Sequence, residues 1–599
     1  MKLKDFKYRC VKLTPGHWQE QRSELIETYL SIDDGDYLHY FKARAGLQDS
    51  YAGLEGWYED NASTFGQILG AFAKLYLTTG DERIYRKAIA LADGWGECAR
   101  ASQAAIDGYS TYVYDKLMTG FLDMYEYLHY GPAKDYIRWL TESADQRFDK
   151  NVSRDGLQIM DGGMIEWYTL PEQLLRAYAL TGEELYKEFA AVWDYDYFWD
   201  RLNNKEFDQI GPRHAYSHVN ALSSAAMFYI TTGEDRYLTA IESAYEEILE
   251  NHTFATGGYG PAECLFAQAE GFLGDMLKAN WDEDRINKTY RNFGNGVVDR
   301  DDQWGSCEVS CCAWAVFKIC NYMLKITGEA KYGDWAERML INGTGGQIPI
   351  TREGQVMYYA DYFINGGCKS TMDGRLHPNG ILFEWQCCTG TFPEDVAEYA
   401  NMLYYKGGTD IYVSQYLPSR LTCTLGEQTV CLENLSLYPK EKNIRFVVHT
   451  AQEYTGTINF RVPAWATRNN CIYVNGVRQI IPVTANEWAV VQGPFKDGDE
   501  IILYFEWPVI FKPVDGANKY IAALCYGPLV MACNKMSLLE GDMEKAADWL
   551  EPIQKDGYSF AFRSKPGHVV PVERIVREFY PYYEIPEGKW YFMYNRFKM

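Results

Sequence analysis

The sequence has no long apolar run. None of its 599 residues fall in a stretch of roughly 18 or more consecutive apolar residues, so no transmembrane helix is expected. The first ten residues, Met1 to Cys10, carry several charges and no apolar core of the kind that a secretory signal peptide requires. From these two absences we expect a cytoplasmic protein that does not associate with a membrane.

Basic residues are also scarce relative to acidic ones. The chain has 58 Lys and Arg against 82 Asp and Glu, a formal net charge of −24. Binding to nucleic acid requires a Lys- and Arg-rich surface that displaces counterions, and an anionic membrane surface selects for the same charge. We therefore expect neither partner, and the excess of acid is accounted for by simple solubility.

The fifteen cysteines form no regular disulfide framework, and an odd number leaves at least one unpaired. Most are expected to be buried apolar thiols. Two groups of cysteines depart from this expectation. Cys387 and Cys388 are adjacent, and the segment 307–312 contains three cysteines and a glutamate. Neighbouring cysteines rarely bond to each other, since the resulting ring is strained. In a chain expected to be cytoplasmic, this pattern favours a soft metal site, most simply zinc.

Aromatic residues make up 16% of the chain, with 48 Tyr and 17 Trp. Rings in this number are typical of clefts that stack on the faces of sugars, and they are also typical of large helical cores. Composition alone leaves both interpretations open.

A short pattern recurs through the first two-thirds of the chain. A Thr-Gly pair followed by an acidic residue, or a looser version of it, lies near positions 80, 131, 182, 233, 282 and 328. The glycine is suited to end a helix in a left-handed conformation, and the acidic residue favours the start of the next helix. Six helical hairpins of about 50 residues each predict an (α/α)6 barrel, with an open helical solenoid as the alternative.

The pattern changes after about residue 405, where runs such as 444–449 and 458–462 alternate with a period of two. Asn475-Gly476 is typical of a tight hairpin turn. We predict an (α/α)6 barrel over residues 1–404, a β-sandwich over 405–535 and a β-rich C-terminal segment over 536–599 that packs on the preceding domains.

The chain resembles the β-L-arabinofuranosidase family, glycoside hydrolase family 127, and its neighbour, family 146. The resemblance covers nearly the whole chain. It rests on Cys387-Cys388, on Thr256-Gly-Gly258 followed by Glu263, on 332–342 with Glu337-Arg338, and on the later segments 460–466, 474–476, 495–499 and 526–530.

The resemblance implies a retaining hydrolysis in which a zinc-bound cysteine thiolate is the nucleophile. Cys387 matches the nucleophile, and Cys388 and Cys311 match zinc ligands. The glutamate of the family's Glu-x-Cys motif falls on Val309, so Glu308 would have to reach the metal through a one-residue shift. Cys307 is the alternative fourth ligand, and four thiolates would favour a purely structural metal.

The resemblance also implies an acid/base and a set of sugar-binding residues. Glu263 matches the acid/base, although it lies further from Glu308 than in the family's arabinofuranosidases; the alternative for Glu263 is a solvated carboxylate. Expected substrate-binding residues are Asp115, Glu166, Tyr168, His218 and Glu337. Asp115 stands where the family often has histidine, which changes the charge and the hydrogen-bond donors of the pocket.

The leading hypothesis is a zinc-dependent glycosidase that removes a terminal sugar, β-L-arabinofuranose or a related unit, from an oligosaccharide. One alternative is an (α/α)6 hydrolase or lyase that uses carboxylates such as Glu166, Asp161 and Glu263, with structural zinc. A second alternative is a sugar-binding homologue without turnover. The architecture is also compatible with a homodimer.

Overall fold

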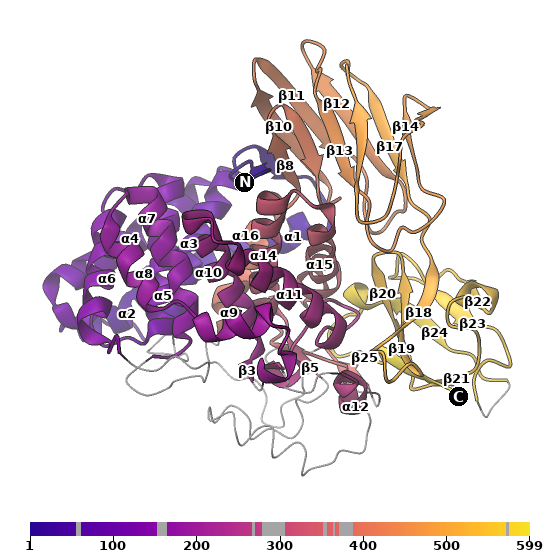
Figure 1. Cartoon of the computed structure of the whole chain (residues 1–599), viewed down its shortest axis with the longest axis horizontal. Helices are drawn as coiled ribbons and strands as arrows, with labels where there is room; N and C mark the ends of the chain where they lie inside the picture. The colour runs from indigo at the N-terminus through magenta and orange to yellow at the C-terminus, as the bar shows by residue number, and fades with distance from the viewer. Residues whose placement is uncertain are drawn as a thin grey trace.

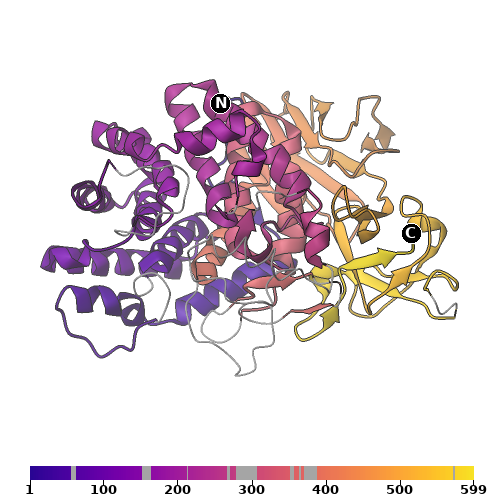
Figure 2. The same cartoon turned by 60° about the horizontal axis from the view of Figure 1, so that its bottom comes forward.

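The computed structural model describes residues 1–54, 62–151, 164–211, 213–265, 270–277, 306–350, 356–362, 364, 366–369, 387–570 and 574–599. A helical domain occupies one side of the molecule, and two β-rich regions lie beside it, formed by the orange and yellow parts of the chain (Figures 1 and 2). Asp161 and the turn predicted near residue 282 lie outside the described residues.

Six helices form the inner ring of the helical domain. Each contacts the next in chain order, and the last contacts the first, so the ring closes and the predicted α/α barrel is confirmed. The inner helices are α3 (Ala62–Thr79), α5 (Thr111–Leu128), α7 (Leu170–Thr181), α10 (Ala215–Thr232), α14 (Ser310–Thr327) and α16 (Cys387–Asn401). They are apolar over most of their surface, as expected for helices covered on both sides.

Five outer helices follow their inner partners through tight turns. Gly80, Gly182, Gly233 and Gly328 adopt left-handed φ values of 71°, 73°, 76° and 72°, which end the preceding helix as the sequence pattern predicted. The outer helices are α4 (Glu82–Ala101), α6 (Ala133–Arg147), α8 (Glu184–Val192), α11 (Asp235–Asn251) and α15 (Gly333–Arg338).

The sixth inner–outer pair is not a hairpin. Helix α1 (His17–Ser31), near the start of the chain, packs on α16, the last inner helix. The two ends of the domain therefore close the ring. Further helices, α2 (Asp34–Arg44), α9 (Asp196–Asn203) and α12 (Phe272–Leu277), lie outside this scheme.

A β-sandwich follows the barrel. Its first sheet has the order β1-β8-β9-β13-β16 and its second the order β15-β14-β17-β12-β11-β10-β2. Phe446 of β12 and Phe460 of β13 join the two sheets, with ring centroids 5.2 Å apart. The strands are β8 (Tyr404–Gly407), β9 (Asp410–Val413), β10 (Ser419–Leu425), β11 (Gln428–Asn434), β12 (Ile444–Thr450), β13 (Thr457–Arg461), β14 (Cys471–Val474), β15 (Val477–Arg478), β16 (Trp488–Gln492) and β17 (Glu500–Tyr504).

The first residues of the chain belong to this sandwich. Strand β1 (Lys4–Asp5) pairs with β8, and β2 (Val11–Leu13) pairs with β10. The prediction that residues 1–404 form only the barrel did not include these two edge strands.

A third sheet contains most of the remaining strands, in the order β21-β26-β19-β20-β24-β23-β22, with β18 paired to β19. Strand β25 (Trp590–Tyr591) pairs instead with β7 (Gly367–Cys368). Strands from before and after residue 535 share the third sheet, so we propose a domain boundary between β17 and β18 in place of the predicted one. Its strands are β18 (Val509–Pro513), β19 (Ile521–Tyr526), β20 (Leu529–Cys533), β21 (Leu538–Leu539), β22 (Leu550–Pro552), β23 (Phe562–Ser564), β24 (Glu578–Pro581) and β26 (Tyr594–Phe597). Among the described residues, no helix is long and apolar enough to cross a membrane.

Candidate active site

Three thiols and a carboxylate meet at the end of the barrel where the inner helices begin. Ligand atoms of Glu308, Cys311, Cys387 and Cys388 all lie within 4.8 Å of one another. The sulfur atoms of Cys311 and Cys388 are 3.7 Å apart, and Glu308 Oε1 lies 3.3 Å from Cys387 Sγ and 3.8 Å from Cys388 Sγ.

Local structure explains how these side chains converge. Cys387 and Cys388 are the first two residues of α16, and Cys311 is the second residue of the adjacent helix α14. Helix N-termini favour negative charge, which suits thiolates. Glu308 ends strand β5 (Ser306–Glu308), and Val309 alone connects that strand to α14. The one-residue offset noted in the sequence is taken up at this junction.

Cys307 does not join the cluster. Successive side chains of a strand point to opposite faces, so Cys307 and Glu308 diverge. The Cys307 thiol lies 3.9 Å from the hydroxyl of Tyr362 instead. The geometry therefore favours Glu308 over Cys307 as the fourth donor.

The four donors suit a tetrahedral metal ion. Two thiolates bound 2.3 Å from one zinc ion at the tetrahedral angle are about 3.8 Å apart, close to the 3.7 Å between Cys311 and Cys388. Three soft sulfur donors with one carboxylate oxygen match the preferences of zinc more closely than those of magnesium or calcium. Cys387 is 8% exposed, whereas the other three residues are 1% exposed or less.

Proton affinities in the cluster reflect burial and crowding. Burial raises the pKa of Glu308 and of Cys311 well above their ordinary values, and the neighbouring Cys387 adds to both effects. A hydrogen bond with Cys311 lowers the pKa of Cys387, but the bond with Cys388, burial and the charge of Glu263 outweigh it, so this pKa is raised. In the absence of a cation, Glu308, Cys311 and Cys387 would therefore tend to be protonated, and binding of a metal ion would displace those protons.

The hydroxyl of one tyrosine, Tyr358, lies between the carboxylate of Glu263 and the sulfur of Cys387. The hydroxyl of Tyr358 donates to Glu263 Oε1 at 2.7 Å and lies 3.8 Å from Cys387 Sγ. Tyr359 also donates to Glu263. Glu263 ends a short 3-10 turn (Pro261–Glu263) with a φ of 63°, a left-handed conformation that is rare for a residue with a side chain. The backbone there is held in a strained position that aims the carboxylate at the site.

A histidine that the sequence analysis did not select joins the carboxylates. Nδ1 of His214 lies 2.6 Å from Glu166 Oε1, and Nε2 lies 3.8 Å from Glu263 Oε2 and 4.0 Å from Glu308 Oε2. Burial alone would lower the pKa of His214, but Glu166, Glu263 and Cys387 raise it to about 9. His214 is therefore a positive centre among three carboxylates.

Sequence comparison identifies the family. Residues 10–401 match the model of the β-L-arabinofuranosidase GH127 catalytic domain, and residues 410–507 match that of the GH127 middle domain. The chain belongs to glycoside hydrolase family 127. It is therefore a glycoside hydrolase by family, and the family implies a carbohydrate substrate. No curated protein sequence gives a significant match.

Solved structures agree with this assignment at the level of fold. A GH127 β-L-arabinofuranosidase from Geobacillus stearothermophilus T6 shares 15% identity with a TM-score of 0.69, over 98% of this chain and 100% of that chain. A GH127 β-arabinofuranosidase shares 16% identity with a TM-score of 0.71, over 100% of this chain and 98% of the other. At such identities the likeness establishes the fold alone.

We expected His218 to contact substrate. In the structure both of its ring nitrogens lie within hydrogen-bond distance of other protein groups. Nδ1 lies 2.8 Å from the carbonyl oxygen of His214, and Nε2 lies 3.2 Å from the hydroxyl of Tyr195. Burial lowers its pKa well below the ordinary value. Tyr168 packs on the His218 ring at 4.3 Å and shares a hydrogen bond with Ser217. His218 thus contacts the backbone of His214 directly and Tyr168 reaches it through Ser217, and substrate contact by either residue stays a prediction.

Asp115 lies beside the site. Its Oδ2 atom accepts from Lys116 Nζ at 2.6 Å and from Thr169 Oγ1 at 3.2 Å, whereas Oδ1 has no hydrogen-bond partner among the described residues. The pKa of Tyr216 is raised well above its ordinary value by burial, by Tyr112 and by the charges of Cys311, Glu166 and Asp115. The charges of Asp115, Glu166 and Cys311 therefore act on the same tyrosine.

Glu337, which we expected to bind substrate, has its carboxylate occupied by residues outside the barrel. Its carboxylate accepts from Tyr438, from Arg461 Nη2 at 2.8 Å and from Trp465 Nε1 at 2.9 Å, all residues of the β-sandwich. Arg461 is completely buried and also binds Asp334. Glu337 thus anchors the barrel to the sandwich.

Proposed function

We propose that this family 127 chain is a retaining glycosidase that releases a terminal β-L-arabinofuranosyl unit, or a closely related sugar, from an oligosaccharide. The observation that carries the proposal is the relation between Cys387 and Glu263. Cys387 is the most exposed member of the four-residue cluster, and Tyr358 lies between its sulfur and the carboxylate of Glu263.

We assign Glu308, Cys311, Cys387 and Cys388 as the ligands of a zinc ion. When bound, zinc would keep these thiols deprotonated at neutral pH. The donor set and its spacing support the assignment. Cys387 stands at the start of α16 and is the most exposed of the four donors, which leaves its sulfur the best placed of them to meet a substrate.

The reaction would proceed in two displacements. In the first, the Cys387 sulfur forms a bond to the anomeric carbon while the bond to the leaving oxygen breaks, and Glu263 gives that oxygen its proton. In the second, Glu263 takes a proton from water, the water oxygen bonds to the anomeric carbon, and the carbon–sulfur bond breaks. Two inversions leave the anomeric configuration unchanged.

The surrounding polar groups define the sugar that fits. His214 holds Glu166 in place, and one oxygen each of Glu166, Asp115 and Glu308 has no hydrogen-bond partner among the described residues. Buried carboxylate oxygens accept from sugar hydroxyls and repel anionic groups. A neutral sugar that presents several hydroxyl donors is therefore the preferred substrate class.

Hydrolysis of an aryl β-L-arabinofuranoside tests the proposal, with a panel of other pentosides and deoxyglycosides beside it. We expect Cys387→Ser to lose at least about a thousandfold in kcat/KM, while Cys307→Ser, a buried neighbour outside the cluster, keeps most of its activity. Survival of Cys387→Ser with loss in Glu166→Gln would instead support carboxylate chemistry. Sugar binding without hydrolysis of any glycoside would support a non-catalytic homologue.

A further inference from the structure

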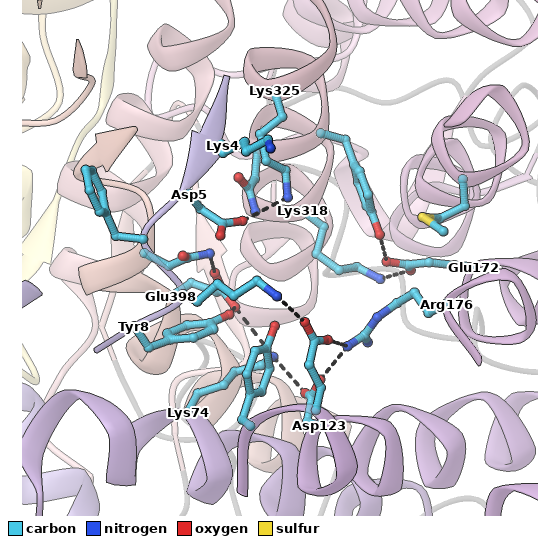
Figure 3. Close-up of a pocket in the computed structure, with 18 of the residues that line it drawn as sticks. Lys4, Asp5, Tyr8, Lys74, Asp123, Glu172, Arg176, Lys318, Lys325 and Glu398 are labelled. Atoms are coloured by element: carbon cyan, nitrogen blue, oxygen red, sulfur yellow. Dashed lines mark hydrogen bonds and ion pairs between the residues drawn. The ribbon is translucent and has the colours of Figure 1, made fainter. Parts of the chain in front are cut away.

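A cavity with many charged side chains lies at the end of the barrel opposite the cysteine cluster. It has a volume of about 530 Å³ and is lined by the last turns of the inner helices, among them Lys74, Asp123, Arg176 and Lys318. The N-terminal segment around β1 closes one side of it (Figure 3). Figure 1 shows the N-terminus near one end of the barrel and strand β5, which carries Glu308, near the other.

The indole of Trp314 separates this cavity from the cysteine cluster. Lys116 Nζ lies 4.7 Å from the ring centroid, and Lys318 Nζ lies 4.3 Å from it. Lys116 is bound to Asp115 beside the catalytic end, whereas Lys318 lines the cavity. Cys311 and Lys318 are seven residues apart on α14, about 10 Å along the helix axis. The cavity is therefore a compartment of its own.

Every carboxylate that lines the cavity already has a cationic partner. The pairs are Asp5 with Lys325 at 3.1 Å, Asp123 with Arg176 at 2.6 Å, Glu126 with Lys7 at 3.2 Å, Glu398 with Lys74 at 3.5 Å, and Glu172 with Lys318. Two lining lysines, Lys4 and Lys406, have no ion pair among the residues that the structure describes. The lining has seven cationic side chains against five carboxylates. The buried Glu394, which binds Lys74 at 2.6 Å from outside the lining, reduces this excess of positive charge to one.

The two remaining lysines are forced together by the sheet. Lys4 of β1 stands directly opposite Lys406 of β8 in the antiparallel register. Like charges in such cross-strand pairs repel each other, and an anion placed between them would remove that cost. Lys406 Nζ also lies 5.3 Å from the ring centroid of Phe6, which holds it on this side of the strand.

The interior of the cavity contains further groups that could contact a hydroxylated anion. Burial lowers the pKa of Lys318 even though Glu172 is bound to it, and a negative ligand nearby would favour its charged form. The amide oxygens of Asn321 and Asn401 line the cavity without a hydrogen-bond partner among the described residues, so they are free to accept from hydroxyl groups.

We propose that this cavity is a second ligand site, which binds a small hydroxylated anion such as a phosphorylated or carboxylated monosaccharide. Its anionic group would lie between Lys4 and Lys406, and its hydroxyls would reach Asn321 and Asn401. A volume of about 530 Å³ is ample for such a molecule. The site is separate from the hydrolytic one and does not depend on the function proposed above.

Calorimetric titration of the purified full chain tests this site. The probes are arabinose 5-phosphate, arabinonate and inorganic phosphate, with neutral arabinose for comparison. We expect the phosphorylated sugar, the sugar acid or both to bind with one site per chain, and more tightly than neutral arabinose. Binding of the phosphorylated sugar alone would identify a phosphoryl ligand, and binding of arabinonate alone a carboxylate ligand.

Substitutions test whether the anionic sugar binds at Lys4 and Lys406. The double variant Lys4→Ala/Lys406→Ala should bind the anionic sugar at least about tenfold more weakly, with an unchanged melting temperature. Lys12→Ala removes an exposed lysine of the neighbouring strand β2 and should bind as the wild type does. Cys387→Ser should also bind normally, because the catalytic end is not involved. The proposal is overturned if no anionic sugar binds at millimolar concentration, if the double variant binds as tightly as the wild type, or if Cys387→Ser abolishes binding.

Discussion

The sulfur atoms of Cys311 and Cys388 lie 3.7 Å apart although the two residues are 77 positions apart in the chain. They meet because each stands at the start of an inner helix, and α14 and α16 are neighbours in the closed ring. The same end of the barrel receives Glu308 from β5, Glu263 from a strained turn and His214 from the residue before α10. Ring closure thus assembles the site from segments that are distant in sequence.

Metal content should depend on the cluster and not on cysteines beside it. Wild-type protein purified without added metal should contain about one zinc per chain. Cys388→Ala should contain far less, because three donors remain where the geometry provides four. Elemental analysis of both proteins measures the difference.

Cys307→Ala is the matched control for that measurement. Cys307 is as buried as the ligands and lies next to Glu308, but its thiol faces Tyr362. It should keep a full complement of zinc. If Cys307→Ala loses the zinc and Cys388→Ala retains it, the ligands are assigned wrongly.

Replacing Glu263 should affect substrates according to their leaving groups. Glu263→Gln cannot protonate the leaving oxygen, so hydrolysis of natural oligosaccharides should fall by about 10² to 10⁴ in kcat/KM. Aryl glycosides with acidic leaving groups need little protonation and should be cleaved much more readily. Steady-state kinetics on both substrate types give the ratio, and equal losses on the two would argue against Glu263 as the acid.

Glu337→Gln should reduce stability and leave the chemistry intact. It leaves the guanidinium of Arg461 buried with a weaker partner, and breaking a buried ion pair costs about 3 kcal/mol. Chemical denaturation should show this loss, while kcat of the folded enzyme stays near the wild-type value. Glu329→Gln, which removes an exposed ion pair with Lys331 at 3.0 Å, is the control and should change stability by less than about 1 kcal/mol. A large fall in kcat for Glu337→Gln at unchanged stability would return this residue to the sugar pocket.

His252 should make the protein sensitive to mild acid. Burial lowers its pKa from 6.5 to about 3, so the folded state holds it neutral while the unfolded state binds a proton below pH 6.5. Its contribution to stability is present above pH 6.5 and is lost as the pH falls toward 3, at up to about 1.4 kcal/mol per pH unit. His252→Gln should flatten the fall in unfolding free energy between pH 6.5 and 5. A fall in His252→Gln as steep as in the wild type would contradict this account.

The helical repeat was predictable because its signal is local. A left-handed glycine ends four of the six inner helices, as at Gly182 and Gly233, and is visible within a few residues of sequence. The same locality explains the cysteine pair, since Cys387 and Cys388 are adjacent. Closure by α1 and α16, and the pairing of β1 and β2 with the sandwich, join the two ends of a domain, and no short-range pattern reports such contacts.

The site itself was predictable only in part. Sequence spacing does not distinguish His214 from His218, which are four residues apart; the structure separates them because His218 lies inside α10 while His214 precedes it. Tyr358 reaches Glu263 through the pairing of β5 with β6 (Tyr359–Asp361), a contact between distant segments. The ion pair of Glu337 with Arg461 joins the barrel to another domain, and no local sequence pattern reports such a contact.

The most direct test of the account is the mass of the active-site peptide during turnover. Glu263→Gln treated with a reactive aryl β-L-arabinofuranoside should complete the first displacement and stall before the second. Digestion and mass spectrometry should then find one pentosyl group on Cys387. The same group on Glu166 or another carboxylate, or continued turnover by Cys387→Ser, would contradict the cysteine nucleophile.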